Sequence, residues 1–82
     1  MASETQRLWL TFDASASQKP LLCLMTRKFD VVFNIRNASV AKEVGILGVS
    51  FEGDRQVVKQ AIAWLEGEGV QVEPVEINTI EG

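Results

Sequence analysis

Hydrophobic and polar residues alternate in three short segments of the chain. From Arg7 to Asp13 every second side chain is apolar, and similar alternation returns from Asp30 to Arg36 and from Ile46 to Phe51. A period of two is typical of a strand that buries one of its faces. The polar connection 37–43 between the second and third segments is short, so we expect these two strands to form a hairpin.

Two other segments carry apolar residues at helical spacing. The first is Pro20–Phe29, where the proline suits the first turn of a helix because its missing N–H is not needed there. The second is Arg55–Glu66, with Asp54 as its expected N-cap. Gly67 or Gly69 is expected to supply the left-handed residue that ends this helix.

A fourth strand is expected at residues 70–75, interrupted by Pro74, a residue that is tolerated mainly on edge strands. The order β-α-β-β-α-β is the split βαβ arrangement of ferredoxin-like folds, in which two helices cover one face of a four-stranded antiparallel sheet. The pattern therefore predicts an α+β fold. We expect a single domain over residues 1–82, with its core at about 6–77 and a flexible tail at 78–82.

The predicted strands divide their side chains between the two faces of the sheet. Those expected to face the helices are Leu8, Leu10, Phe12, Phe33, Val49 and Phe51. This division leaves Trp9, Val32 and Ile46, together with Asn34, for the uncovered face or its edge. Three apolar side chains on an uncovered sheet indicate a contact surface, so Trp9, Val32 and Ile46 are the candidate interface residues.

Composition narrows the classes of partner. The chain has 82 residues, of which 46% are apolar, which is typical of one folded domain. Its formal charge of -3 and the absence of a Lys/Arg run argue against nucleic acid as a partner. No stretch approaches the roughly 20 apolar residues of a membrane span, and the first residues lack the core of a signal peptide, so we expect a cytoplasmic protein that does not insert into a membrane.

The chain has one cysteine and no histidine, which excludes an intrachain disulfide, zinc fingers and cysteine-ligated clusters within one chain. We therefore expect no metal and no cofactor. Cys23 lies in an apolar run and is expected to be buried as a small hydrophobic residue, with Met25 and Trp64 in the core or at its margin. No nucleophile with an adjacent base is visible, so an enzyme is not expected and no catalytic residue is assigned.

Four features, in order along nearly the whole chain, resemble one known family. They are Arg7–Phe12, Pro20–Leu22 with Arg27–Phe29, Phe33–Ile35, and Gly53 with Ala61–Glu66 and Gly69–Glu73. Together they resemble the NIL domain, which in its best-known setting follows the ATPase domain of methionine importers. The pair Asn34-Ile35 corresponds to the asparagine and isoleucine that give the domain its name.

In those importers the domain is understood to pair with its counterpart in the other subunit and to bind methionine near that interface, which inhibits transport. The resemblance therefore implies a regulatory, ligand-sensing domain that forms a homodimer and binds methionine or a related small amino acid. The chain has no P-loop of the form GxxxxGK[ST], so we expect a stand-alone domain without a transport ATPase of its own.

The candidate ligand-binding residues are Asn34, Ile35 and Arg36. The Asn34 amide can donate to a carboxylate and accept from an ammonium group, which are the two ends of an amino acid. Arg36, two residues further along, can hold a carboxylate in a bidentate pair. The alternatives are a solvated strand asparagine for Asn34 and an edge-strand charge that discourages aggregation for Arg36. Trp9 suits either a stack on a ligand or packing in a dimer.

A second function remains open at this point. The same open face suits a protein-interaction adaptor without a small-molecule ligand, whose partner would be a transporter ATPase or a protein of sulfur metabolism. A sensor requires a pocket with convergent polar groups, whereas an adaptor requires only a complementary flat surface.

Overall fold

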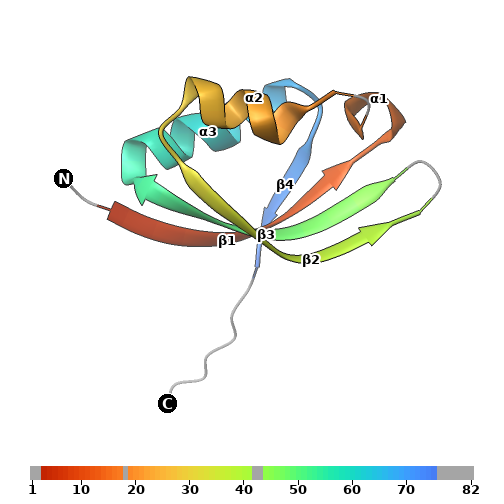
Figure 1. Ribbon diagram of the computed structural model, residues 1–82, viewed down its shortest axis with the longest axis horizontal. Helices are drawn as coiled ribbons and strands as arrows, with labels where there is room; N and C mark the ends of the chain where they lie inside the picture. The colour runs from red at the N-terminus through yellow and green to blue at the C-terminus, as the bar shows by residue number, and fades with distance from the viewer. Residues whose placement is uncertain (1–2, 18, 42–43, 76–82) are drawn as a thin grey trace, which may run out of the picture.

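In a computed structural model, which describes residues 3–17, 19–41 and 44–75, the chain forms four strands and three helices (Figure 1). In chain order they are β1 (Ser3–Phe12), α1 (Ala14–Ser17), α2 (Leu21–Lys28), β2 (Val32–Val40), β3 (Gly45–Asp54), α3 (Arg55–Gly67) and β4 (Gln71–Pro74). The strands form one antiparallel sheet in the order β2-β3-β1-β4, and the helices lie on one side of it (Figure 1). The predicted ferredoxin-like α+β fold and the β2–β3 hairpin are confirmed.

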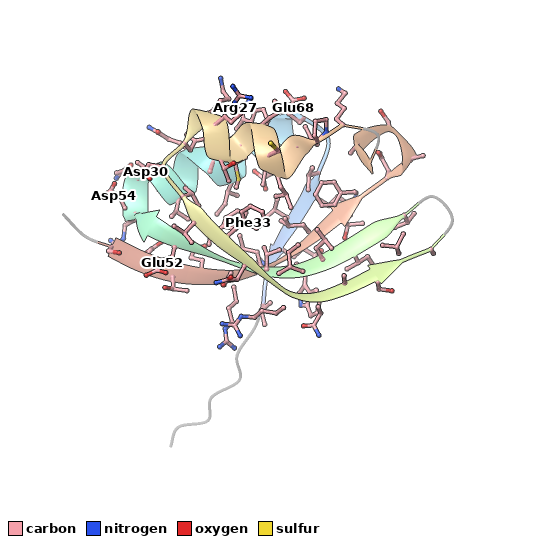
Figure 2. The ribbon with its side chains drawn as sticks, in the orientation of Figure 1. Arg27, Asp30, Phe33, Glu52, Asp54 and Glu68 are labelled. Carbon is pink, nitrogen blue, oxygen red and sulfur yellow. The ribbon has the colours of Figure 1, made fainter. Side chains whose placement is uncertain are left out.

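The core lies between the sheet and the two longer helices. Alternate residues of β1 and β3 point toward the helices and meet buried residues of α2 and α3. Buried members of this core are Leu8, Leu10, Phe12, Val49, Phe51, Leu21, Met25, Val58, Ala61 and Leu65. Phe33 of β2 also points toward the helices (Figure 2) and meets Phe51 edge to face, with ring centroids 6.5 Å apart. The period-two alternation thus identifies the helix-facing side correctly.

Helix α3 begins and ends with the caps that its flanking residues predict. The Asp54 carboxylate accepts a hydrogen bond from the Gln56 N–H at 3.1 Å. At the other end Gly69 has φ +98°, its N–H bonds to the Glu66 carbonyl, and the Val70 N–H bonds to the Leu65 carbonyl. This pair of bonds is a Schellman motif, so Gly69 is the left-handed stop.

Strand β2 is longer than its alternation predicts. The polar segment from Asn37 onward, expected as a connection, continues the strand to Val40. A β-bulge interrupts the pairing between Ile35 and Asn37, where Arg36 is an extra residue with no partner on β3. The segment expected as a loop after β1 also contains the one-turn helix α1, where the Asp13 carboxylate accepts from the Ala16 N–H at 2.8 Å.

The prediction that Cys23 is buried is wrong, because its side chain is exposed. Helix α2 turns Leu21 and Met25, four residues apart, toward the core, and Cys23 lies between them on the other side of the helix. The core placement of Met25 is confirmed, since its side chain is 0% exposed. Trp64 lies at the core margin, where its ring meets Phe29 edge to face at 6.4 Å.

The two edges of the sheet differ. Strand β4 is a short edge strand that contains Pro74, as predicted, and the Val75 N–H extends its pairing by bonding to the Arg7 carbonyl. Strand β2 forms the other edge and is more than twice as long. The predicted flexible tail 78–82 lies outside the described residues. None of the helices in the described part of the chain is long and apolar enough to cross a membrane.

Candidate functional site

The face of the sheet turned away from the helices, called here the open face, is the candidate site. Its side chains form four rows that run across paired strands, from β2 through β3 to β1 and, in two rows, to β4. The rows are Val32, Glu52, Thr5; Asn34, Ser50, Arg7; Asn37, Gly48, Trp9, Glu73; and Ser39, Ile46, Thr11, Gln71. Aromatic, amide, cationic and anionic groups therefore share one surface.

The centre of the open face is a glycine beneath an indole ring. A Cβ added at Gly48 would lie 2.9 Å from Cζ3 of Trp9 and 3.3 Å from Oδ1 of Asn37. The Trp9 ring and the Asn37 amide therefore meet above Gly48, where a larger residue would separate them. Trp9 keeps 38% of its surface exposed, so the ring is available to a ligand or a partner.

Asn34 lies in the neighbouring row, opposite Ser50. Ser50 is 5% exposed, whereas Asn34 is exposed, and no side-chain hydrogen bond joins the Asn34 amide to another of the described residues. Its donor and acceptor are thus open to solvent or to a bound molecule.

The three predicted ligand-binding residues do not converge on one face. Ile35 pairs with Val49, whose side chain faces the helices, so Ile35 belongs to the opposite face from Asn34. It nevertheless stays 54% exposed because it lies at the sheet edge. Arg36 is the unpaired residue of the bulge rather than the next residue along the Asn34 face. Of the three, only Asn34 lies in a row of the open face.

The three predicted interface residues do share the open face. Trp9, Val32 and Ile46 are 38%, 60% and 39% exposed, respectively. Trp9 and Ile46 lie in adjacent rows on neighbouring strands, while Val32 lies at the far end of β2, beyond the Asn34 row. The apolar part of this face is therefore centred on Trp9 and Ile46.

Asn37 is the member of the site that the alternation misses. Counting by two from Asn34 assigns the even-numbered residues of β2 to the open face and Asn37 to the helix side. The bulge reverses that assignment from Asn37 onward, and the alternation of polar and apolar residues gives no signal of it.

The charges near the open face are surface charges. Arg7 is opposite Ser50, and Glu73 is opposite Trp9 on the edge strand β4. Among the described residues, Glu4 has a lowered pKa, and it lies away from this face. The Gln6 amide donates a hydrogen bond to the Glu4 carboxylate at 2.7 Å and the Arg55 guanidinium donates another at 3.2 Å, and both lower the pKa of this carboxyl. Over the described residues, no group of three His, Cys, Asp or Glu side chains is arranged to hold a metal ion.

Comparison with known proteins places this arrangement in a family. The model of the NIL domain matches residues 6–74 of the 82-residue chain, a span that runs from within β1 to the end of β4. No curated protein matches the sequence significantly.

Proposed function

Because the chain belongs to the NIL domain family, we propose that it is a regulatory domain that binds a small amino acid, with methionine as the first candidate, on its open face. The observation that supports this proposal best is the contact of Trp9 and Asn37 above Gly48, with the exposed Asn34 in the next row of the same face. The two amides offer donors and acceptors to the carboxylate and ammonium of an amino acid. The indole ring offers the kind of aromatic edge and face with which a thioether makes favourable contacts.

The open face is a surface without walls, and a small ligand there would stay largely in water. Ligand sites normally bury most of their ligand. We therefore propose that two copies of the domain meet with the amino acid between them, and that Trp9 and Ile46, with Val32 further along β2, form the apolar part of the contact. Glu73, opposite Trp9, and Arg36 in the bulge supply charges of both signs at the margins of this contact.

The experiment is a calorimetric titration of the purified protein with L-methionine, combined with sedimentation analysis of its oligomeric state. We expect saturable binding to a dimer. We expect Asn34→Ala to weaken it by at least about tenfold, which corresponds to the loss of one hydrogen bond to a charged group. Gln60→Ala, which removes an exposed amide on α3, is the matched control. Equal affinity in Asn34→Ala and Gln60→Ala would remove Asn34 from the site.

A protein-interaction adaptor is the second candidate, and one observation favours it. Strand β2 is an uncovered edge of nine residues that exposes Val32, Ile35 and Val40, with exposed fractions of 60%, 54% and 80%. The unpaired backbone groups of such an edge can accept another strand, most readily on the segments on either side of the Arg36 bulge. A stable assembly that gives no heat with methionine, homocysteine, cysteine or the other amino acids would favour the adaptor.

A further inference from the structure

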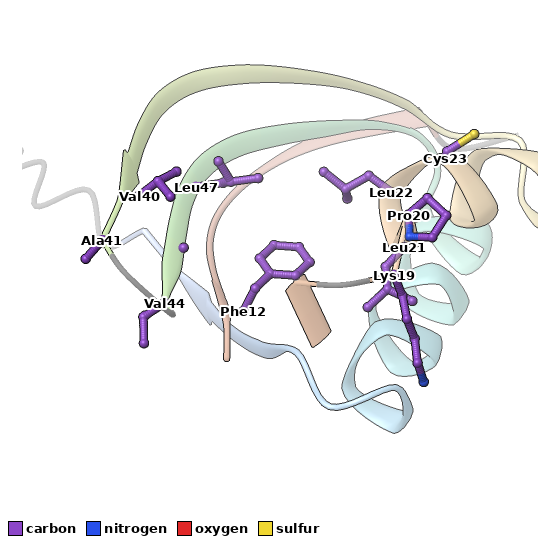
Figure 3. Close-up of a pocket in the computed structure, with 11 residues that line it drawn as sticks. Phe12, Lys19, Pro20, Leu21, Leu22, Cys23, Val40, Ala41, Val44 and Leu47 are labelled. Carbon is purple, nitrogen blue, oxygen red and sulfur yellow. The ribbon is translucent and has the colours of Figure 1, made fainter. Parts of the chain in front are cut away.

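On the helix side of the sheet the protein has a cavity that the proposed function does not use. Its volume is about 410 Å³, and it lies between the start of α2, the end of β1 and the outer half of the β2–β3 hairpin (Figure 3). Its walls are formed by Phe12, Leu21, Leu22, Val40, Ala41, Val44, Gly45 and Leu47, and its rim by Lys19, Pro20 and Cys23. We call it the apolar cavity.

The cavity exists because the row of paired residues at this end of the sheet includes a glycine, Gly45, in place of a residue with a side chain. Phe12, Gly45 and Val40 are paired across β1, β3 and β2, and all three line the cavity. A Cβ added at Gly45 would meet no atom within 4 Å. The hairpin also extends beyond the helices, so Val40 and Val44 stay 80% and 42% exposed although they belong to an apolar wall. The wall is therefore apolar surface that the fold itself leaves uncovered.

The size and chemistry of the walls define what fits. An enclosed apolar cavity of about 150 Å³ is enough to hold a benzene molecule. This one is larger and open to solvent on one side, so it can seat a longer hydrocarbon group whose polar end stays in water. Its volume is within the range of ligand pockets, which are mostly lined by apolar side chains. An aliphatic chain would contact Phe12, Leu22 and Leu47 in the interior and would cover the exposed wall of the hairpin.

The positive groups at the rim favour a molecule whose polar end is negatively charged. Lys19 is the charged residue among those that line the cavity. Its ammonium lies 3.8 Å from the Glu68 carboxylate in an exposed pair, an arrangement too weak to prevent it from turning to another anion. Helix α2 also begins at this rim without a side-chain cap, which leaves the positive end of its dipole uncompensated.

We propose that the apolar cavity binds a small amphiphilic carboxylate, with its aliphatic chain against Phe12, Leu22 and Leu47 and its carboxylate at Lys19. This site is separate from the amino acid site, because the two lie on opposite faces of the sheet. A chain that fills the cavity would also hold the hairpin against α2, since its two walls come from these elements.

In the test, octanoate is titrated into the ¹⁵N-labelled protein, and its binding is measured from the amide chemical shifts. We expect saturable shifts at Leu22, Ala41, Gly45 and Leu47. Octanoate should bind more tightly than octanol, and octylammonium should bind most weakly, because of the charge at the rim. Lys19→Gln should reduce the difference between octanoate and octanol.

Gly45→Leu is the decisive variant, because its side chain grows into the empty space without a clash. It should weaken octanoate binding by at least about tenfold, since the chain loses most of its apolar surroundings. Gly67→Leu is the matched control: it makes the same change at the end of α3, where an added Cβ also meets nothing within 4 Å. Unchanged affinity in Gly45→Leu, or shifts confined to residues outside the cavity, would overturn the proposal.

The two proposed sites can be tested independently of each other. Asn34→Ala should leave octanoate binding intact, and Gly45→Leu should leave methionine binding intact. Methionine binding that is lost in Gly45→Leu but retained in Asn34→Ala would overturn the open-face site and support the cavity as a carboxylate site.

Discussion

Replacement of Gly48 by valine tests the geometry at the centre of the open face. The Cβ position lies 2.9 Å from Cζ3 of Trp9, a separation that real side chains do not tolerate, so the indole ring must move. Overpacking of this kind costs about 1–3 kcal/mol, and the upper part of that range applies because valine adds two further methyl groups. A glycine in a strand loses more conformational entropy on folding than other residues do, so replacing it offsets about 0.5–1 kcal/mol of this cost. We therefore expect Gly48→Val to lower the free energy of unfolding by about 1–2 kcal/mol.

The effect of Gly48→Val on the free energy of unfolding should reverse its sign once the Trp9 ring is absent. In a Trp9→Ala background the clash with the ring disappears, and the approach to Asn37 Oδ1 at 3.3 Å can be relieved by rotation of that exposed amide. The gain in strand rigidity then dominates, so Gly48→Val should stabilise the protein by about 0.5–1 kcal/mol. The coupling energy between the two positions is then about 2–3 kcal/mol, the size expected for side chains in direct contact. In a domain of this size each kcal/mol corresponds to a shift in Tm of about 4–8 °C.

The assay is urea unfolding of the four proteins of this double-mutant cycle, followed by circular dichroism. Gly45→Val in both backgrounds is the control, since Gly45 has no atom within 4 Å of its added Cβ and faces the other side of the sheet. If Gly48→Val destabilises both backgrounds equally, the ring does not lie over Gly48.

Two further predictions concern the core and the acid range. Met25→Ala should lower the free energy of unfolding by about 2–5 kcal/mol, because the Met25 side chain is fully buried. Leu24→Ala on the same helix should lower it far less, because Leu24 is 40% exposed. Denaturant titrations of both variants measure the difference. The Gln6 hydrogen bond and Arg55 lower the pKa of Glu4 below its ordinary value of 4.5. The ionised Glu4 therefore contributes its full stabilisation above pH 4.5, and this stabilisation is lost as the pH falls through the lower pKa of the folded state. Glu4→Gln should therefore flatten this part of the stability profile, measured as Tm against pH, and an unchanged profile would contradict the assignment.

Local patterns were sufficient to predict the architecture. The period-two segments identified the helix-facing residues of β1 and β3, because a strand that buries one face must repeat its apolar residues every second position. The caps of α3 were also predictable, since Asp54 and Gly69 act through hydrogen bonds and a backbone conformation that depend on neighbours in sequence.

Features that depend on packing or on register could not be predicted in this way. Cys23 lies in an apolar run, but the run is longer than the buried stripe of a helix, so some of its members must face solvent. The end of β2 was misplaced because Asn37, Ala38 and Ser39 are polar or small residues that pair with β3 through their backbone. The apolar cavity arises from the absence of a side chain at Gly45 and from elements far apart in sequence, neither of which leaves a periodic signal.

The bulge at Arg36 determines which residues of the outer half of β2 lie on each face of the sheet. Because it shifts the alternation by one residue, it places Asn37 beside Trp9 on one face and, three residues later, Val40 in the wall of the cavity on the other. If Arg36 paired with Gly48 instead of bulging, both positions would exchange at once, with Ser39 turned to the cavity and Val40 to the open face. A bulge in an edge strand is therefore enough to set the chemistry of both surfaces together, while every helix and the pairing of β1 with β3 remain as they are.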